Sequence, residues 1–295
     1  MEVKTLKIPT YTAEEFEKLN YHSPADRTNW TKNHFNEFEI HRIEDHKESI
    51  KFPLLPHRKT INDFIYLTEG KIIRSKGLET FEFNENQIFF LPAHNITTTD
   101  FVSQNAKGMY CHFADDLISR KSVRELPFFD VSNQPIIKIT ERKRSQIEPL
   151  LKRLLEIENL DKQIISQYIE LILTELNQVY ENKTNTSKAS AFVITEKFKK
   201  ELLRKIYTLQ TVKGFADELN ISPNHLNKCV KAITNRTAQD WINEMIILEA
   251  KVLLRQTDKS ISEIAFDLTK QDVSDFGRFF KSKTGMKPSE FREMD

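Results

Sequence analysis

One pattern occurs twice in the last third of the chain, about fifty residues apart, and it constrains the fold more than any other feature. In each copy a helix-capping residue precedes a short helix with apolar periodicity, then a turn and a second helix. The first copy starts at Thr211, turns at Asn220-Ile221 and restarts at Ser222-Pro223, and the second starts at Ser260. Serine caps a helix N-terminus and proline suits its first position, while asparagine tolerates the left-handed turn. The repetition predicts two similar helix pairs in an all-α segment.

Each pair has the features of a helix-turn-helix. In the first copy, small Ala216 allows close packing, Leu226 and Val230 point inward, and the opposite face is rich in Asn and Lys. Those side chains can hydrogen-bond base edges or phosphate oxygens in a major groove. A plain helical hairpin with a solvated polar face is the alternative, which the repetition disfavours. A long helix over Trp241–Leu254 connects the pairs and would hold them about one DNA turn, roughly 34 Å, apart.

Residues 211–292 resemble the DNA-binding domain of the AraC/XylS family of bacterial regulators. The matching segments are Ala216–Leu219, Ser222–Leu226, Leu248–Leu254, Ile261–Ala265, Phe276–Lys281 and Thr284–Arg292. By this resemblance, base-reading positions fall on Asn224, Asn227 and Lys228 in the first pair and on Ser274, Asp275 and Arg278 in the second. DNA-backbone contacts fall around Ser222 and Asp272, and His225, Lys231 and Lys281 complete the predicted DNA-binding residues.

The second turn departs from the family pattern. The family usually has Gly-Phe there, whereas this chain has Thr269-Lys270. A β-branched residue adopts the left-handed conformation less readily than glycine. The sequence therefore predicts either a differently built turn or weaker DNA binding by the second pair.

The N-terminal part has the period of short β-strands. Phe38–Ile43 alternates apolar and polar residues, and Phe64–Leu67 and Lys71–Ile73 flank Gly70 as in a hairpin. Phe81–Phe83 and Ile88–Leu91 add further strands. This pattern favours a small β-barrel or jelly roll. Residues 1–140 resemble the cupin-like sensor domain that members of this family carry.

Residues 141–182 predict a helical hairpin. Its second apolar stripe runs from Ile164 to Tyr180, and Ser145 with Glu148 fits a capping box that would place Pro149 near the start of the first helix. The hairpin must bury its apolar face against its own barrel or against a second copy. Residues 183–191 have almost no apolar content and predict a linker, with the DNA-binding domain over residues 192–295. The expected class is α+β with two domains: an N-terminal cupin-like barrel with the hairpin, and a C-terminal double helix-turn-helix.

Net charge and cysteine content exclude few classes of function. The net charge is +1. Residues 190–295 hold 18 Lys and Arg against 15 Asp and Glu, a weak indication that this part faces a polyanion. No secretory signal and no apolar run of the roughly 18 residues that a membrane span needs is present. Cys111 and Cys229 are far apart, which favours reduced thiols in a cytoplasmic protein.

The barrel leaves three functions open. The first is a transcriptional regulator that senses a small effector and works as a homodimer; the resemblance implies activation through contact with RNA polymerase. Weak candidates for effector contact are the expected inward-facing aromatics Phe64, Tyr66, Phe81, Phe83, Phe89 and Tyr110. The second is a ligand-independent regulator whose barrel only dimerises. The third is a metal-dependent cupin enzyme with an appended DNA-binding domain.

The histidine spacing argues against the enzyme. Cupin metal sites use about three His and one carboxylate, with two His a single residue apart on one strand. The histidines in or near the strands are His41, His46, His57, His94 and His112, and no two of them have that spacing. We therefore expect no metal, no cofactor and no catalysis.

Overall fold

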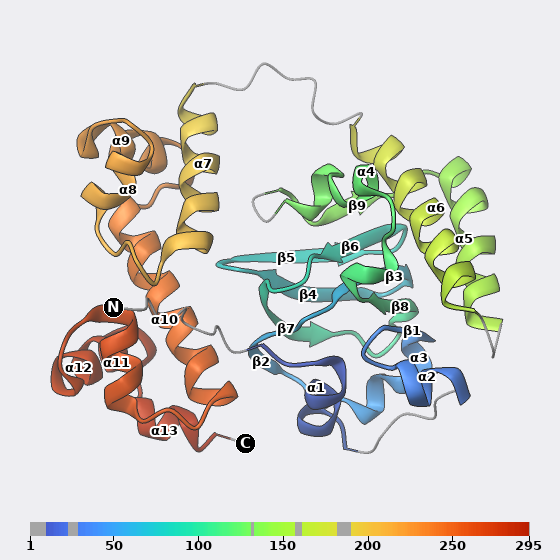
Figure 1. Cartoon of the computed structure of the whole chain (residues 1–295), viewed down its shortest axis with the longest axis horizontal. Coiled ribbons are helices and arrows are strands. Elements are labelled where there is room, and N and C mark those ends of the chain that lie inside the picture. The colour runs from blue at the N-terminus through green and yellow to red at the C-terminus, as the bar shows by residue number, and fades with distance from the viewer. Residues whose placement is uncertain (1–9, 23–28, 131–132, 157–160, 182–189, 295) are drawn as a thin grey trace. The chain divides into compact units, whose positions relative to one another are not determined.

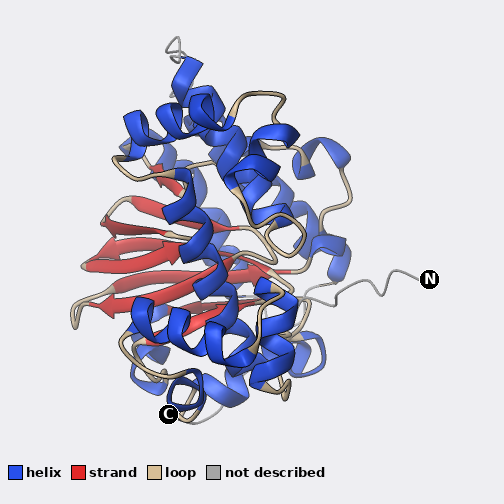
Figure 2. Ribbon diagram, turned by 90° about the vertical axis from the view of Figure 1, so that its left-hand side faces the viewer, coloured by secondary structure: helices blue, strands red, loops and turns tan. Residues whose placement is uncertain are grey.

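Strands and helices are segregated along the chain. The computed structural model describes residues 10–22, 29–130, 133–156, 161–181 and 190–294. The chain divides into two units, a β-sandwich unit spanning Tyr11–Thr186 and a helical unit containing Ser187–Asp295. Every strand of the described residues lies in the β-sandwich unit (Figures 1 and 2). The predicted α+β class is therefore confirmed.

The strands form two antiparallel sheets. The first has the order β1 (Phe38–Arg42), β8 (Lys107–Phe113), β3 (Asn62–Glu69), β6 (Gln87–Leu91) and β9 (Ile136–Lys138). The second has the order β2 (Leu54–Arg58), β7 (Ile96–Val102), β4 (Lys71–Lys76) and β5 (Glu79–Asn84). Short helices α1 (Ala13–Asn20), α2 (Asn29–His34), α3 (Ile43–His46) and α4 (Lys121–Arg124) lie between or before the strands. Buried apolar side chains, among them Leu67, Phe83 and Phe89, form a core shared by both sheets.

The chain changes sheet at Gly70 instead of forming a hairpin there. β3 pairs with β6 and β8, whereas β4 pairs with β5 and β7. Gly70 has φ of 81°, and a Cβ at this position would lie 2.5 Å from Ser103 Oγ. The predicted strands are present, but the predicted hairpin is wrong. A local pattern locates the turn without specifying which strand becomes the neighbour.

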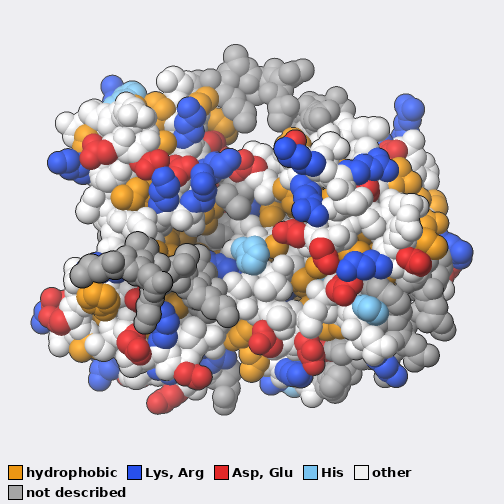
Figure 3. All heavy atoms as spheres, viewed as in Figure 1, with side chains coloured by type: hydrophobic (Ala, Val, Ile, Leu, Met, Phe, Trp, Pro, Cys, Tyr) orange, Lys and Arg blue, Asp and Glu red, His pale blue; other side chains and the backbone are white. Residues whose placement is uncertain are grey.

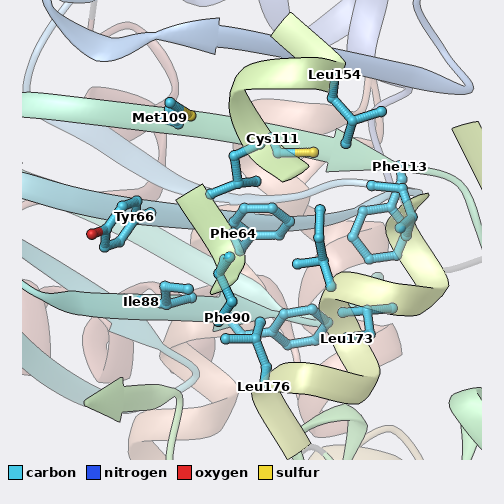
Figure 4. Close-up of a cluster of buried hydrophobic side chains, with 14 of the residues drawn as sticks. Phe64, Tyr66, Ile88, Phe90, Met109, Cys111, Phe113, Leu154, Leu173 and Leu176 are labelled. Carbon is cyan, nitrogen blue, oxygen red and sulfur yellow. The ribbon is translucent and has the colours of Figure 1, made fainter. Parts of the chain in front are cut away.

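The outer face of the first sheet is covered by the helical hairpin of α5 (Glu141–Glu156) and α6 (Lys162–Glu181) (Figure 4). Successive side chains of a strand point to opposite faces, so Phe64 and Tyr66 of β3 face the hairpin while Ile65 and Leu67 face the sandwich interior. The hairpin contributes buried side chains such as Leu173 to the same cluster. The packing of the hairpin on its own barrel, one of the two alternatives above, is therefore present.

Helix α5 begins earlier than predicted. It starts at Glu141, where Thr140 Oγ1 accepts the Lys143 N–H at 3.4 Å, and the Ser145 hydroxyl donates to the Arg142 carbonyl instead of capping. The predicted capping box at Ser145 is therefore wrong. Pro149 lies in the helix interior on the exposed side. Solvent can therefore satisfy the carbonyl that proline leaves without a donor.

The helical unit contains α7 (Ser190–Lys205), α8 (Val212–Glu218), α9 (Pro223–Thr234), α10 (Ala238–Gln256), α11 (Ile261–Thr269), α12 (Val273–Thr284) and α13 (Pro288–Arg292). Its core includes Phe198, Phe215, Leu253, Phe276 and Phe280. Most of the predicted linker over residues 183–191, namely residues 183–189, lies outside the described residues. Helix α7 starts at Ser190, two residues before the predicted start of the domain.

Candidate functional site

The first helix-turn-helix consists of α8, the turn at Asn220-Ile221 and α9. Thr211 Oγ1 accepts the Gly214 N–H at 3.0 Å, and Ser222 Oγ accepts the His225 N–H at 3.2 Å. Asn220 is left-handed with φ of 54°, and Pro223 occupies the first turn of α9. Both predicted caps and the predicted turn are present. They fix the angle between the two helices.

The outer face of α9 is polar and carries uncompensated positive charge. Asn224, His225, Lys228 and Lys231 are exposed, while Leu226 and Val230 are buried. Among the described residues neither Lys228 nor Lys231 forms an ion pair. On the face shown in Figure 3, Lys and Arg are interspersed with Asp and Glu. The local charge of α9 therefore matters more for DNA binding than the overall balance.

Asn227 does not belong to this outer face. Its side-chain Oδ1 accepts the N–H of Ala238, at the start of α10, at 3.0 Å, and the side chain is half-buried. This bond satisfies one of the unpaired N–H groups at a helix start. The structure therefore gives Asn227 a contact that joins α9 to α10, and base reading by Asn227 stays a prediction of the resemblance.

The second helix-turn-helix consists of α11, its turn and α12. Ser260 caps α11 in a capping box with Glu263. The left-handed residue of the turn is Lys270, with φ of 57°, and not Thr269, which ends the helix. Lys270 Nζ lies 4.9 Å from the ring centre of Phe266, whose side chain is 62% exposed. Because Lys270 and not Thr269 takes the left-handed conformation, the strain expected at the β-branched Thr269 does not arise.

The start of α12 is capped by a carboxylate. Asp272 Oδ1 accepts the N–H groups of Ser274 and Asp275 at 2.7 and 2.9 Å. These backbone donors hold the pKa of Asp272 below its usual value. Asp272 thus satisfies two of the N–H groups that have no partner within the helix at its start.

The exposed face of α12 differs in charge from that of α9. Ser274, Asp275, Arg278 and Lys281 are all exposed. Arg278 forms an ion pair with Asp275, three residues earlier on the same helix. The negative charge on this face makes the second helix-turn-helix less basic than the first.

Helix α10 joins the two helix-turn-helix units. It has 19 residues, starts in a capping box of Thr237 and Asp240, and packs against α8, α9, α11, α12 and α13. The carboxylate of buried Glu249 accepts a hydrogen bond from the Tyr207 hydroxyl at 2.8 Å, which joins the turn after α7 to the middle of α10. α9 and α12 have the same length, with starts at residues 223 and 273. The two recognition helices therefore stand on one continuous support.

The β-sandwich unit contains a partly open cavity of about 80 Å³. Apolar residues such as Ile43, Ile65 and Val102 form most of its wall. Its polar residues are Glu17, Tyr21, Glu39, His41, Lys47, Lys59, Arg74, Thr99, Tyr110 and His112. A volume of this size holds several waters or part of a small organic molecule.

Buried charges lie along one side of this cavity. Lys59 Nζ is 2.8 Å from Asp63 Oδ2 and donates to the Tyr110 hydroxyl at 2.9 Å, and Arg74 binds the same carboxylate at 2.6 and 3.0 Å. Burial alone would raise the pKa of Asp63, but Arg74 and Lys59 outweigh burial and hold this pKa below its usual range. Sequence analysis missed these residues. The available signal was a charged residue inside an otherwise apolar strand, as at Asp63 in β3.

The candidate effector residues do not share one site. Tyr110 lines the cavity. Phe81, Phe83 and Phe89 pack in the sandwich core. Phe64 and Tyr66 face the α5–α6 hairpin, so their predicted inward orientation is wrong because the alternation of β3 has the opposite phase.

Within the described part of the chain, no group of three or more His, Cys, Asp or Glu side chains is placed to hold a metal ion. No helix in that part is long and apolar enough to cross a membrane.

Comparisons with known proteins agree on the helical unit. Residues 215–294 match the family described as a helix-turn-helix domain. The chain is 33% identical over 102 residues to the Bacillus subtilis bifunctional transcriptional activator/DNA repair enzyme AdaA, covering 35% of this chain and 46% of that one. It is 31% identical over 81 residues to the Escherichia fergusonii transcriptional activator RhaS, covering 28% and 29%. The matches thus span less than half of these relatives.

A solved structure is similar over a longer stretch. The structure of ToxT from Vibrio cholerae O395, bound to a naphthalenyl butenoic acid, covers 87% of this chain and 97% of its own. The TM-score is 0.41 and the sequence identity is 15%.

Proposed function

We propose that this chain, whose C-terminal third is a helix-turn-helix domain of the AraC/XylS family, regulates transcription by binding specific double-stranded DNA. The observation that carries the proposal is the pair of recognition helices α9 and α12, of equal length and joined by α10. Each presents a polar face that fits a major groove. The related activators have the same domain, which favours activation through RNA polymerase as the mode of action. Such a regulator works in the cytoplasm and needs no catalysis.

The proposal is tested by selecting DNA from a random pool with the full-length protein at near-physiological salt. We expect a motif of two short blocks about one helical turn, roughly 34 Å, apart. Lys228→Ala is expected to weaken binding to that motif by about 1–3 kcal/mol. Lys213→Ala, at an exposed position of α8, serves as the control. Absence of any enriched sequence would reject the DNA-binding function of the free protein.

We also propose that the cavity of the β-sandwich unit binds a small effector. Lys59 and Tyr110 present hydrogen-bonding groups beside a mostly apolar wall. This chemistry suits a small molecule with one polar group and an apolar body. A thermal-shift screen of such molecules on the full chain tests the idea, with Lys59→Met as the variant that should lose the shift. A protein that no small molecule stabilises would favour a ligand-independent regulator.

The third part of the proposal is a homodimer formed through α6. Ile164, Gln167, Leu171 and Thr174 form an exposed stripe with heptad spacing and no formal charge. Ile164 and Leu171 are 43% and 46% exposed although the opposite face of α6 is fully packed on the sheet. An uncharged stripe with this spacing suits the same stripe of a second copy.

A further inference from the structure

We propose that Asp275 determines base specificity in the second helix-turn-helix by holding the Arg278 guanidinium ready to bind guanine. The inference rests on the proposed DNA-binding function and adds a residue that acts through another. Asp275 is a positioning residue, and Arg278 makes the base contact.

The geometry begins at the helix cap. The Asp275 N–H donates to Asp272 Oδ1 at 2.9 Å, which fixes the first turn of α12. Asp275 Oδ1 accepts a hydrogen bond from Arg278 Nη2 on the next turn. The two side chains are 47% and 80% exposed, so the pair stands on the outer face of the helix. Among the described residues the Arg278 guanidinium has no other hydrogen bond.

The pair leaves the reading edge of arginine free. A guanidinium has five N–H donors, and one bond to Nη2 leaves one two-donor edge available whichever of the Nη2 hydrogens is used. Guanine offers O6 and N7 as paired acceptors in the major groove, and an arginine fork matches them. An arginine that is already oriented has less side-chain freedom to lose on binding.

The first helix-turn-helix lacks this arrangement. The positions fifty residues earlier are His225 and Lys228, and the exposed face of α9 carries no acidic residue. A lysine ammonium is a compact point charge that suits phosphate, whereas a held arginine suits a base edge. The first helix-turn-helix therefore contributes more of the salt-dependent affinity, and the second contributes more of the discrimination between bases.

The test compares full-length wild type and Asp275→Asn by fluorescence anisotropy. The duplexes are the selected motif and its copies with each guanine of the second block changed to adenine. We expect Asp275→Asn to lower the preference for one guanine by about five- to tenfold, within the range of one base contact. Arg278→Lys should lose the same preference although it keeps the charge. Asp258→Asn, which removes an acid from the loop before α11, should change nothing.

Two results would overturn the inference. If Asp275 only repels phosphate, Asp275→Asn will tighten binding to every duplex alike and leave the guanine preference intact. A second block without any guanine that the wild type prefers would also reject it. Either outcome leaves the first block enriched, whereas failure of the proposed function itself would leave no enriched block at all.

Discussion

One backbone N–H group explains why equivalent positions of the two helix-turn-helix units hold different residue types. Asn227 and Gly277 lie fifty residues apart on α9 and α12, and so do Ala238 and Pro288 at the starts of α10 and α13. Ala238 has an N–H, which Asn227 accepts at 3.0 Å. Pro288 has none, and a Cβ on Gly277 would meet nothing within 4 Å. The first helix-turn-helix therefore needs an acceptor where the second does not.

This difference predicts the behaviour of Asn227→Ala. The variant leaves the buried Ala238 N–H without an acceptor, so we expect a loss of about 0.5–1.5 kcal/mol in the free energy of unfolding of the helical unit. Ala238→Pro removes that N–H at a helix position that accepts proline. In the double variant the loss from Asn227→Ala should largely disappear. Urea unfolding of the four proteins measures the coupling. Full stability with lost DNA specificity in Asn227→Ala would instead support base reading by Asn227.

Residue types at helix starts could be predicted from sequence because the interactions are local. Thr211, Ser222 and Ser260 all cap as expected. The contacts of Asn227 and Asp63 could not be predicted from sequence, because their partners lie elsewhere in the fold. Sequence places Asn227 on a polar helix face but does not reveal the start of α10 beside it. Likewise, the buried charge of Asp63 is explained only by the fold, in which β4 places Arg74 within ion-pair distance of it.

At the scale of elements, the periodicity of the sequence predicts where strands and helices lie better than it predicts which strands pair. The strands around Gly70 were found, but their assignment to two sheets depends on β8 and β7, which come later in the chain. The two stripes of the helical hairpin were found as well. The start of α5 was misplaced because Pro149 was expected near a helix start, whereas it is exposed in the interior. Tertiary packing on the sheet overrides that local preference.

The two faces of α6 predict different responses to substitution. Leu171→Glu places a charge in the exposed stripe, so we expect a shift from dimer to monomer with little loss of folding stability. Leu173→Ala removes a buried side chain of the sheet–hairpin cluster and should lower the free energy of unfolding by about 2–5 kcal/mol. Analytical ultracentrifugation and urea unfolding separate the two effects. A wild type that sediments as a monomer at high concentration would argue against the stripe as an interface.

At the scale of the whole molecule, the two units should differ in their response to acid. Burial lowers the pKa of His57 to about 3 and that of His112 to about 4, and both belong to the β-sandwich unit. The unfolded chain protonates these residues near pH 6.5 while the folded unit does not. Their contribution to stability is therefore complete above pH 6.5 and is lost as pH falls toward 4. Each histidine is expected to lower the free energy of unfolding of this unit by up to about 2 kcal/mol between pH 7 and pH 5.

The unit that responds can be identified by hydrogen exchange with mass spectrometry, corrected for the intrinsic exchange rate. Peptides of β3 and β8 should lose protection as pH falls from 7 to 5, and peptides of α9 and α10 should not. His112→Gln keeps a donor for the Phe35 carbonyl and should reduce the pH dependence. His225→Asn, at an exposed position, is the matched control. Equal acid sensitivity in both units would contradict the assignment.

The length of α10 sets the spacing at which one molecule can use both helix-turn-helix units. Nineteen residues at 1.5 Å each give a helix of about 28 Å, close to one turn of DNA. Inserting about five base pairs between the two selected blocks turns them to opposite faces of the duplex, so we expect affinity to fall to that of a single block. On that duplex Arg278→Ala should no longer weaken specific binding.

Inserting about ten base pairs returns the two blocks to the same face of the duplex but adds roughly 34 Å between them, which α10 does not span, so affinity should stay low. Recovery at ten base pairs would mean that the two blocks are read by different protomers, and the dimer rather than α10 would then set the spacing.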